Sequence, residues 1–447
     1  MKMKHGLIIT ALLLCAVMLA GCVGQSSPSP APEPAPTTAE PASDTPAAET
    51  TPEPAVEAPP PSDSTGEPVT LKVWVPQNQI TPGTIDKMQQ QFQELHPEWA
   101  ITFTTEVQGE DTAKTEILKD VSASGDVFMF ANDQIQELID AGAIAQLGGS
   151  TEQMVRDTMP TAVVDTVTVD GKLYGIPFTH NTFFMFYDKT ILTAEDVTSL
   201  EKIMAKETPD NVYNFQFDPA GGWKGAAFYY GAGLTVYGAD AVSYSEGCNW
   251  NNPTGIAVTN YLIDLINAPK CVYADDAAAS ELAAEHRLGA WWDGSWNYGT
   301  YKEALGDDLG LAILPTFNPD GNDYQLKGFY GSKAIGVNRM APFPQVAVAF
   351  AAFLGSQEMQ QIRFEETQQV PTNTVVGDSP AVQADEVAAV IVQEAALASV
   401  AQPTNANFGS KYWSVSGGLF AEIKGGTLTK DNVQEKMDTF VEALKVE

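Results

Sequence analysis

Residues 171 to 190, GKLYGIPFTHNTFFMFYDKT, constrain the fold of this chain more than any other stretch. Leu173 to Ile176 begin an extended apolar run, Pro177 interrupts regular strand pairing, and Phe183 to Tyr187 form a second apolar strand after a polar break. One interpretation is an unusual hairpin. The other is that the chain leaves one lobe, crosses to a second lobe at Thr179-His180-Asn181, and places polar side chains in the cleft between them, where ligand sites concentrate.

The N-terminus has the pattern of an export signal. Lys2 and Lys4 precede an apolar run from Leu7 to Ala20, which is short for a transmembrane helix and leads into Leu-Ala-Gly-Cys22. This ending resembles the lipobox of bacterial lipoproteins, and the resemblance implies a signal peptide at 1–21 and lipidation of Cys22. The alternative is an ordinary secretory signal with an incidental cysteine. Both interpretations predict export; the first also predicts anchoring to the outer face of the cytoplasmic membrane.

The composition changes sharply after Cys22. Residues 23 to 68 hold 13 of the 29 prolines and eight acidic residues but no Lys or Arg, which predicts a disordered, fairly stiff tether. The remaining body, from Val69 to Glu447, is long enough for two domains and carries roughly −27 of the net charge of −33. This charge argues against nucleic acids and anionic membrane surfaces as partners. Cys248 and Cys271 remain in the body, and a disulfide and two free thiols are both open.

Strand and helix patterns alternate through the first part of the body. The expected elements are a strand at 71–75, a helix at 84–95, a strand at 100–107, a helix at 112–122, a strand at 127–130 and a helix after 131–133. This order predicts a doubly wound α/β fold with a parallel sheet. Ligands bind at the carboxyl ends of such strands, which directs attention to Gln77 and Asn78 and to Phe130, Asn132 and Asp133.

The second part of the body gives a mixed pattern. Thr193 and Asp196 predict a capped helix through Met204. Further helices are expected at 228–230, 255–267, 277–287 and 433–444, and strands at 289–292, 309–314 and 333–338. A helix with Val346, Phe350, Phe353 and Leu354 on one side is expected after the last of these strands.

Several kinds of chemistry lack a motif. The body has three histidines, and no CxxC, HExxH, GxSxG, P-loop or GxGxxG pattern, so no metal or cofactor is expected. The segment 318–323, NPDGND, is expected to be a plain turn and not a calcium loop. Paired carboxylates for glycoside hydrolysis stay open, because 57 acidic residues guarantee accidental pairs.

Aromatic residues at expected strand ends and turns are the positive signal. Phe130, Trp223, Trp296 and Trp413 each adjoin polar or glycine residues. Flat rings suit the apolar faces of sugars, while neighbouring amide, carboxylate and imidazole groups can bond the hydroxyls. We therefore add His180, Asn181, Asp293 and Tyr412 to the candidate binding residues. The alternative for each aromatic residue is packing in a core.

At these residues the chain resembles the extracellular solute-binding proteins of bacterial ABC sugar importers, in particular the maltose and maltodextrin group. The strongest segments are SGDVFMFANDQIQELIDAGAIAQL, GKLYGIPFTHNTFFMFYDKTIL, LGAWWDGSWNY, LAILPTFN and KYWSV. The resemblance implies a two-lobed type II periplasmic-binding-protein-like fold with hinge strands. One crossing would lie at Thr179 and the return at 322–327. Lobe 1 would comprise 69–179 and 326–375, and lobe 2 would comprise 180–325 and 376–447.

The resemblance also assigns roles to individual residues. Phe130 and Asp133 would contact sugar from lobe 1, and Trp223, Trp296 and Trp413 would stack from lobe 2. Three positions depart from the family pattern: Phe130 replaces a tryptophan, Gln134 stands where an arginine is usual, and Asn181 replaces a carboxylate. These departures put maltodextrin itself in doubt.

The expected function is capture of an oligosaccharide by hinge closure and delivery to an ABC importer, by a monomer without catalysis. One alternative is an exported glycosidase or lyase that uses the same aromatic residues. Another is a binding protein for a peptide or polyamine. The sequence does not name the sugar.

Overall fold

The computed structural model describes residues 68–219 and 222–446. The predictions for the signal peptide, for Cys22 and for the tether concern residues outside these ranges. Within them, no helix combines the length and the apolarity needed to cross a membrane.

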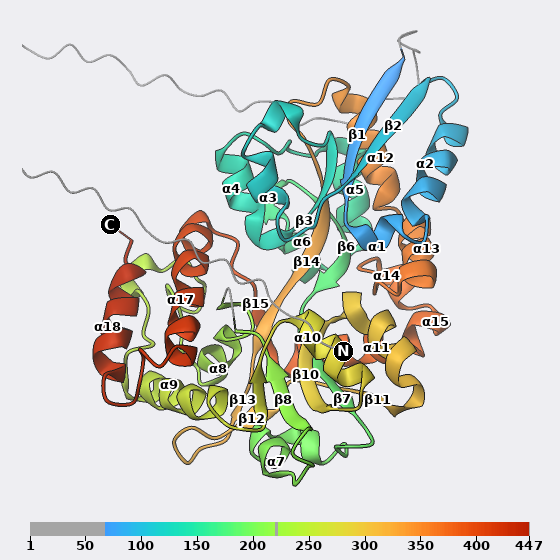
Figure 1. Ribbon diagram of the computed structural model, residues 1–447. Helices are drawn as coiled ribbons and strands as arrows, with labels where there is room; N and C mark the ends of the chain where they lie inside the picture. Colours follow the sequence, from blue (N-terminus) through green and yellow to red (C-terminus); the bar gives the residue numbers. More distant parts are fainter. Residues whose placement is uncertain (1–67, 220–221, 447) are drawn as a thin grey trace, which may run out of the picture. The chain divides into compact units, whose positions relative to one another are not determined.

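Two sheets organise the body (Figure 1). The first has the order β15-β14-β3-β1-β2, with β6 also paired to β14, and the second has the order β11-β7-β10-β8-β9. The strands of the first sheet are β1 (Val69–Val75), β2 (Ile101–Val107), β3 (Val127–Ala131), β6 (Ile176–Asn181), β14 (Gly328–Val337) and β15 (Ser399–Ala401). Those of the second are β7 (Phe183–Asp188), β8 (Tyr213–Phe217), β9 (Cys271–Tyr273), β10 (Leu288–Gly294) and β11 (Leu309–Ala312).

The stretch at 171–190 is not a hairpin. β6 pairs with β14 in the first sheet, whereas β7 pairs with β10 and β11 in the second, so the chain changes sheets at Thr182. The return is made by β14, which pairs with β15 at one end and with β3 at the other. Within the expected return at 322–327, Tyr324–Gln325 forms β13, which belongs to a separate hairpin with β12 (Thr316–Phe317).

Helices cover the sheets, and several of the predicted ones are present. Helices of eight residues or more are α2 (Thr84–Leu95), α5 (Gly149–Thr158), α9 (Pro253–Ile266), α10 (Asp276–Ala284), α11 (Tyr298–Leu305), α12 (Pro344–Leu354), α13 (Gln357–Thr367), α16 (Glu386–Leu397), α17 (Trp413–Lys424) and α18 (Val433–Ala443). Shorter ones are α1 (Gln77–Ile80), α3 (Ala113–Ile117), α4 (Ile135–Asp140), α6 (Thr161–Asp165), α7 (Leu200–Ala205), α8 (Ala226–Gly231), α14 (Thr374–Gly377) and α15 (Pro380–Gln383).

Two helix predictions need correction at their ends. The helix expected at 112–122 stops at Ile117, because the Asp120 carboxylate accepts from the backbone of Ser122 and Ala123 and starts a separate 3₁₀ turn. Thr193 and Asp196 do form the reciprocal capping pair, but a 3₁₀ turn follows it. The helix itself, α7, begins at Leu200, after a second cap at Ser199.

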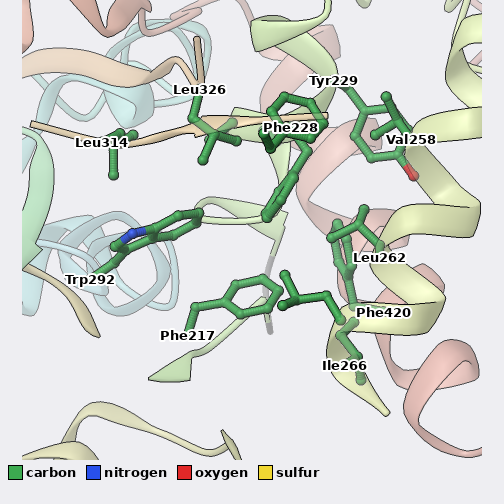
Figure 2. Packing of buried hydrophobic residues seen from close by; sticks show 14 of the residues in the cluster. Phe217, Phe228, Tyr229, Val258, Leu262, Ile266, Trp292, Leu314, Leu326 and Phe420 are labelled. Atoms are coloured by element: carbon green, nitrogen blue, oxygen red, sulfur yellow. The ribbon is translucent and has the colours of Figure 1, made fainter. Parts of the chain in front are cut away.

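The second sheet is buried on both faces. Along β7, Phe183, Met185 and Tyr187 enter one apolar cluster, whereas Phe184 and Phe186 enter another. This alternation is what the pleat of a strand requires, and it explains why β7 reads as continuously apolar. Figure 2 shows the first cluster, in which the Trp292 ring lies beside Phe217, Phe228 and leucine side chains.

The disulfide considered for Cys248 and Cys271 is absent. Both are free, buried thiols in the same apolar cluster. The backbone of each cysteine is paired separately. Cys271 in β9 lies opposite Phe215 in β8, and Cys248 lies opposite Val236 in an isolated bridge. The segment 318–323 is the expected turn: the Gly321 N–H donates to Asn318 Oδ1 at 2.7 Å between β12 and β13.

Candidate ligand-binding cavity

A cavity of about 770 Å³ is lined by residues from both sheets and their flanking elements. Its volume lies in the range of small-molecule sites, which is roughly 300–1,000 Å³. Six of the predicted binding residues line it: Asn78, Asp133, Asn181, Trp223, Trp296 and Trp413. They come from α1, from the turn after β3, from the end of β6, from the turn before α8, from the turn after β10 and from the start of α17.

Phe130 and Tyr412 do not line the cavity, and for them the core interpretation holds. The Phe130 ring is fully buried in the apolar cluster of the first sheet, 5.7 Å from the Phe128 ring. Tyr412 is equally buried, stacks on Phe408 and donates its hydroxyl to the carbonyl of Gly222 at 2.9 Å. Tyr412 therefore supports the turn that carries Trp223, without contacting the cavity.

Gln77, Asn132 and His180 also lie outside the cavity lining. Gln77 is exposed and donates to Thr81. Asn132 is buried and accepts from the backbone N–H of Ser332, which ties the end of β3 to β14. His180 bonds the Tyr330 hydroxyl through Nδ1 at 2.7 Å, and burial lowers its pKa to about 4. Neighbouring residues on a strand point to opposite faces, so Asn181 lines the cavity and His180 does not.

Asp293 is a structural residue of the turn that presents Trp296. Its buried carboxylate accepts from the Gly294 N–H, from Asn297 Nδ2 and from the Tyr301 hydroxyl at 2.6 to 2.8 Å. Burial, with the nearby Asp276 charge, raises its pKa. These bonds fix the turn, and Trp296 and Asn297 then reach the cavity.

Trp296 lies against Gly294, and this contact requires glycine there. A Cβ at Gly294 would lie 2.1 to 2.3 Å from three atoms of the Trp296 ring. The Trp223 ring lies 6.0 Å away from the Trp296 ring, tilted by 30°. Trp223, Trp296 and Trp413 are all partly exposed, as residues that contact a ligand must be.

Apart from Asp133, the charged residues of the cavity were not predicted. Glu110 and Asp111 come from the loop after β2 and Lys114 comes from α3; besides Asp133, the remaining charged lining residues are Asp218, Lys224, Asp276 and Lys333. Lys224 pairs with Asp276, and Lys114 pairs with Glu137 beside the cavity. Lys333 gave the one available signal, since it is a charged residue directly before the apolar stretch Ala334 to Val337 in the predicted strand at 333–338.

Gln134, which replaces an arginine of the family pattern, positions this loop. Its Oε1 accepts from the Lys114 N–H at 2.7 Å, and its Nε2 donates to the carbonyls of Glu110 and Asp111 at 2.6 and 3.1 Å. All of these bonds are internal to the protein. Gln134 therefore contributes to the cavity chiefly by fixing the loop at 110–114.

Asp133 has the most perturbed acid–base behaviour among the lining residues that were predicted. Burial raises its pKa to about 7; the charges of Glu137 and Asp111 add to this rise, and Lys114 opposes it. The carboxyl is therefore protonated in mildly acidic solution and ionised in alkaline solution. A cavity group that titrates near neutrality makes ligand affinity sensitive to pH.

We expect Asp133→Asn to remove a pH dependence of stability. Because the pKa is higher in the folded protein than in the unfolded chain, stability from the protonated form is lost as pH rises toward 7. Relative to the variant, the wild type should lose at most about 4 kcal/mol between pH 4 and 8, at about 1.4 kcal/mol per pKa unit, and less because the group is partly exposed. Urea denaturation across this range tests it, with the exposed Asp378→Asn as control; parallel curves for wild type and Asp133→Asn would contradict it.

Two α/β sheets with an aromatic, hydrogen-bonding cavity between their elements define a ligand-binding protein of the two-lobed type. A model of the family "bacterial extracellular solute-binding protein" matches residues 87–389, and the chain belongs to this family. The similar sequences and the similar structure described below support the same class of two-lobed ligand-binding protein. The prediction of a two-lobed α/β solute-binding fold is thus confirmed.

Individual relatives are distant in sequence. The galactooligosaccharide-binding protein of Bacillus subtilis (strain 168) is 23% identical over 289 residues, which are 60% of this chain and 65% of that protein. A maltooligosaccharide ABC transporter solute-binding lipoprotein of Streptococcus pneumoniae (strain ATCC BAA-255 / R6) is 24% identical, covering 60% and 64%. The chain thus spans slightly less than two thirds of either relative. A solved structure described as "with acarbose" is 36% identical, with a TM-score of 0.80 over 85% of this chain and 99% of that one.

Proposed function

We propose that this protein captures an oligosaccharide outside the cell and delivers it to an ABC importer. The observation that carries the proposal is the cavity of about 770 Å³ lined by Trp223, Trp296 and Trp413 together with amide, carboxylate and ammonium groups. Rings supply apolar faces and the polar groups supply hydrogen bonds, which is the combination that a sugar requires. The names of the two relatives and the acarbose of the similar structure support this ligand class.

The proposed mechanism is closure of the two lobes on the ligand. Asn78 and Asp133 line the cavity from the elements that follow β1 and β3 of the first sheet, and Trp296 lines it from the turn after β10 of the second. A ligand that contacts both sides binds the closed form more tightly and shifts the population toward it. The proposal includes the lobe bounds given above, export with lipidation at Cys22, a monomeric state, and binding without turnover.

We expect oligosaccharides to raise the melting temperature in a ligand panel, because a ligand that binds only the folded protein stabilises it. The panel contains maltotriose, maltotetraose, acarbose and β-1,4-galactotriose, with spermidine and a tripeptide for the alternative ligands. Sugars should act and spermidine and the peptide should not; the reverse result would refute the proposal. Release of reducing ends from a bound sugar would favour the enzyme alternative.

We expect X-ray scattering of residues 68–447 to give a smaller radius of gyration with the best sugar than without it. Closure brings the lobes together, whereas binding to a preformed closed state leaves the radius unchanged. An unchanged radius at saturating sugar would remove the closure mechanism, while the binding function would stand.

A further inference from the structure

Lys333 is a buried cation inside the cavity. It lies on β14 at a register shift in the pairing with β6, and only 9% of its surface is exposed. Its ammonium is 3.5 Å from Glu110 Oε1 and 4.4 Å from the centre of the Trp296 ring. A buried ammonium normally satisfies its three donors with hydrogen bonds. Among residues 68–219 and 222–446, the Lys333 ammonium forms none.

Glu110 is the counterpart of Lys333 and is also under-satisfied. It is 6% exposed, and its Oε1 has no hydrogen-bond partner in the described part of the chain. Its backbone is fixed, because its carbonyl accepts from the Ala131 N–H at 3.1 Å and from Gln134. Removing a carboxylate and an ammonium from water is costly unless hydrogen bonds replace the lost hydration. The pair therefore has unused donor and acceptor capacity at a cavity wall.

Gly294 and the Lys333 ammonium both lie against the Trp296 ring. A Cβ at Gly294 would be nearly equidistant, at 2.1, 2.2 and 2.3 Å, from three adjacent atoms of the six-membered ring, which places it over one face and not beyond the edge. The Lys333 ammonium also lies over the ring, 4.4 Å from its centre. A sugar that stacks on this part of the Trp296 ring must therefore take the place of the Lys333 ammonium.

We infer that Lys333, together with Glu110, determines ligand specificity. A sugar ring displaces the Lys333 ammonium from the Trp296 ring, and the ammonium then donates hydrogen bonds to hydroxyl oxygens of the sugar. The attraction between a cation and an indole ring is modest, so a sugar ring that buries its own apolar face there can displace the ammonium. The displaced ammonium stays beside the sugar ring because its attraction to the Glu110 carboxylate holds it there. The subsite thus requires an oligosaccharide with a hydroxyl oxygen next to the stacked sugar. This inference rests on the proposed function and specifies its ligand contacts.

The test is calorimetric titration of Lys333→Met with maltotriose and β-1,4-galactotriose. For the trisaccharide that wild type binds more tightly, affinity should fall about 10- to 100-fold, the range for losing hydrogen bonds to a charged group. Lys333→Arg keeps the charge and the donors and should stay within about tenfold of wild type. Glu110→Gln is the second variant, in case Lys333→Met does not fold. Lys302→Met removes a lysine from an exposed ion pair with Glu386 and should bind normally.

Monodeoxy derivatives of the same trisaccharide separate a ligand contact from a structural role. Wild type should bind one derivative about 10- to 100-fold more weakly than the parent sugar, and Lys333→Met or Glu110→Gln should not distinguish the two. Equal affinity of wild type and folded Lys333→Met, or full discrimination by the folded variants, overturns the inference and leaves the proposed function standing. If wild type binds no oligosaccharide in the panel, both fall.

Discussion

Replacing Trp296 by alanine should weaken oligosaccharide binding by roughly 30- to 1000-fold and change the stability of the ligand-free protein little. Burying an indole against a ligand contributes roughly 2 to 4 kcal/mol, by analogy with tryptophan truncations at interfaces, and each tenfold in affinity corresponds to about 1.4 kcal/mol. The ring is partly exposed and ends in the cavity. Its removal therefore enlarges a space that is already open to water and leaves no closed void.

The measurement is sugar affinity and the urea midpoint on the same Trp296→Ala protein. The sugar is the oligosaccharide that wild type binds most tightly in the panel. Trp99→Ala is the matched control, because Trp99 is also partly exposed but stacks on His96 away from the cavity. If the midpoint of Trp296→Ala collapses while the folded fraction binds sugar normally, Trp296 is a core residue and not a ligand contact.

Local pattern was enough to predict the strands and the change of sheet. β1 and β3 follow directly from short apolar runs and β2 from alternating apolar and polar residues, and the polar break at 179–181 lies next to the crossing at Thr182. Pro177 does not end a strand, because it lies within β6 opposite Ala334, at a register shift. Helix ends were less predictable, because Asp120 and Ser199 provide caps that compete with longer helices. The region of α13 to α16 escaped prediction. In α16 the charged residue Glu394 is fully buried and its carboxylate accepts from the Leu314 N–H. A charged residue on the buried face breaks the apolar periodicity by which a helix is recognised.

Some residues that line the cavity could be predicted from the sequence and others could not, for a physical reason. Trp223, Trp296 and Trp413 were found because each adjoins residues typical of turns, so a local signal exists. The Glu110–Lys333 pair joins a loop to a strand far along the chain, and only the fold brings them together. Phe130 was misassigned because a strand end predicts position along the sheet but not the face to which the side chain points.

Trp292 and Trp296 are four residues apart, and the structure gives them opposite roles. Trp292 lies on β10 and is fully buried (Figure 2). Its ring centre lies 5.2 to 5.8 Å from those of four phenylalanines: Phe183, Phe215, Phe217 and Phe228. Rings at such spacings interact favourably beyond the area that they bury. The cluster also packs β10 against β7, β8 and α8, so the loss of its central ring should affect the whole second sheet.

Trp292→Ala should therefore lower the free energy of unfolding by about 3 to 5 kcal/mol, the range for truncating a buried aromatic ring. Trp292→Phe, which keeps a smaller ring in the same site, should lose less. Urea denaturation of both variants beside Trp296→Ala measures the contrast, and sugar affinity of the folded Trp292→Phe protein should stay close to that of wild type. A Trp292→Ala protein with the midpoint of wild type would mean that the cluster closes over the missing ring without loss, and the packing described for the second sheet would then be wrong.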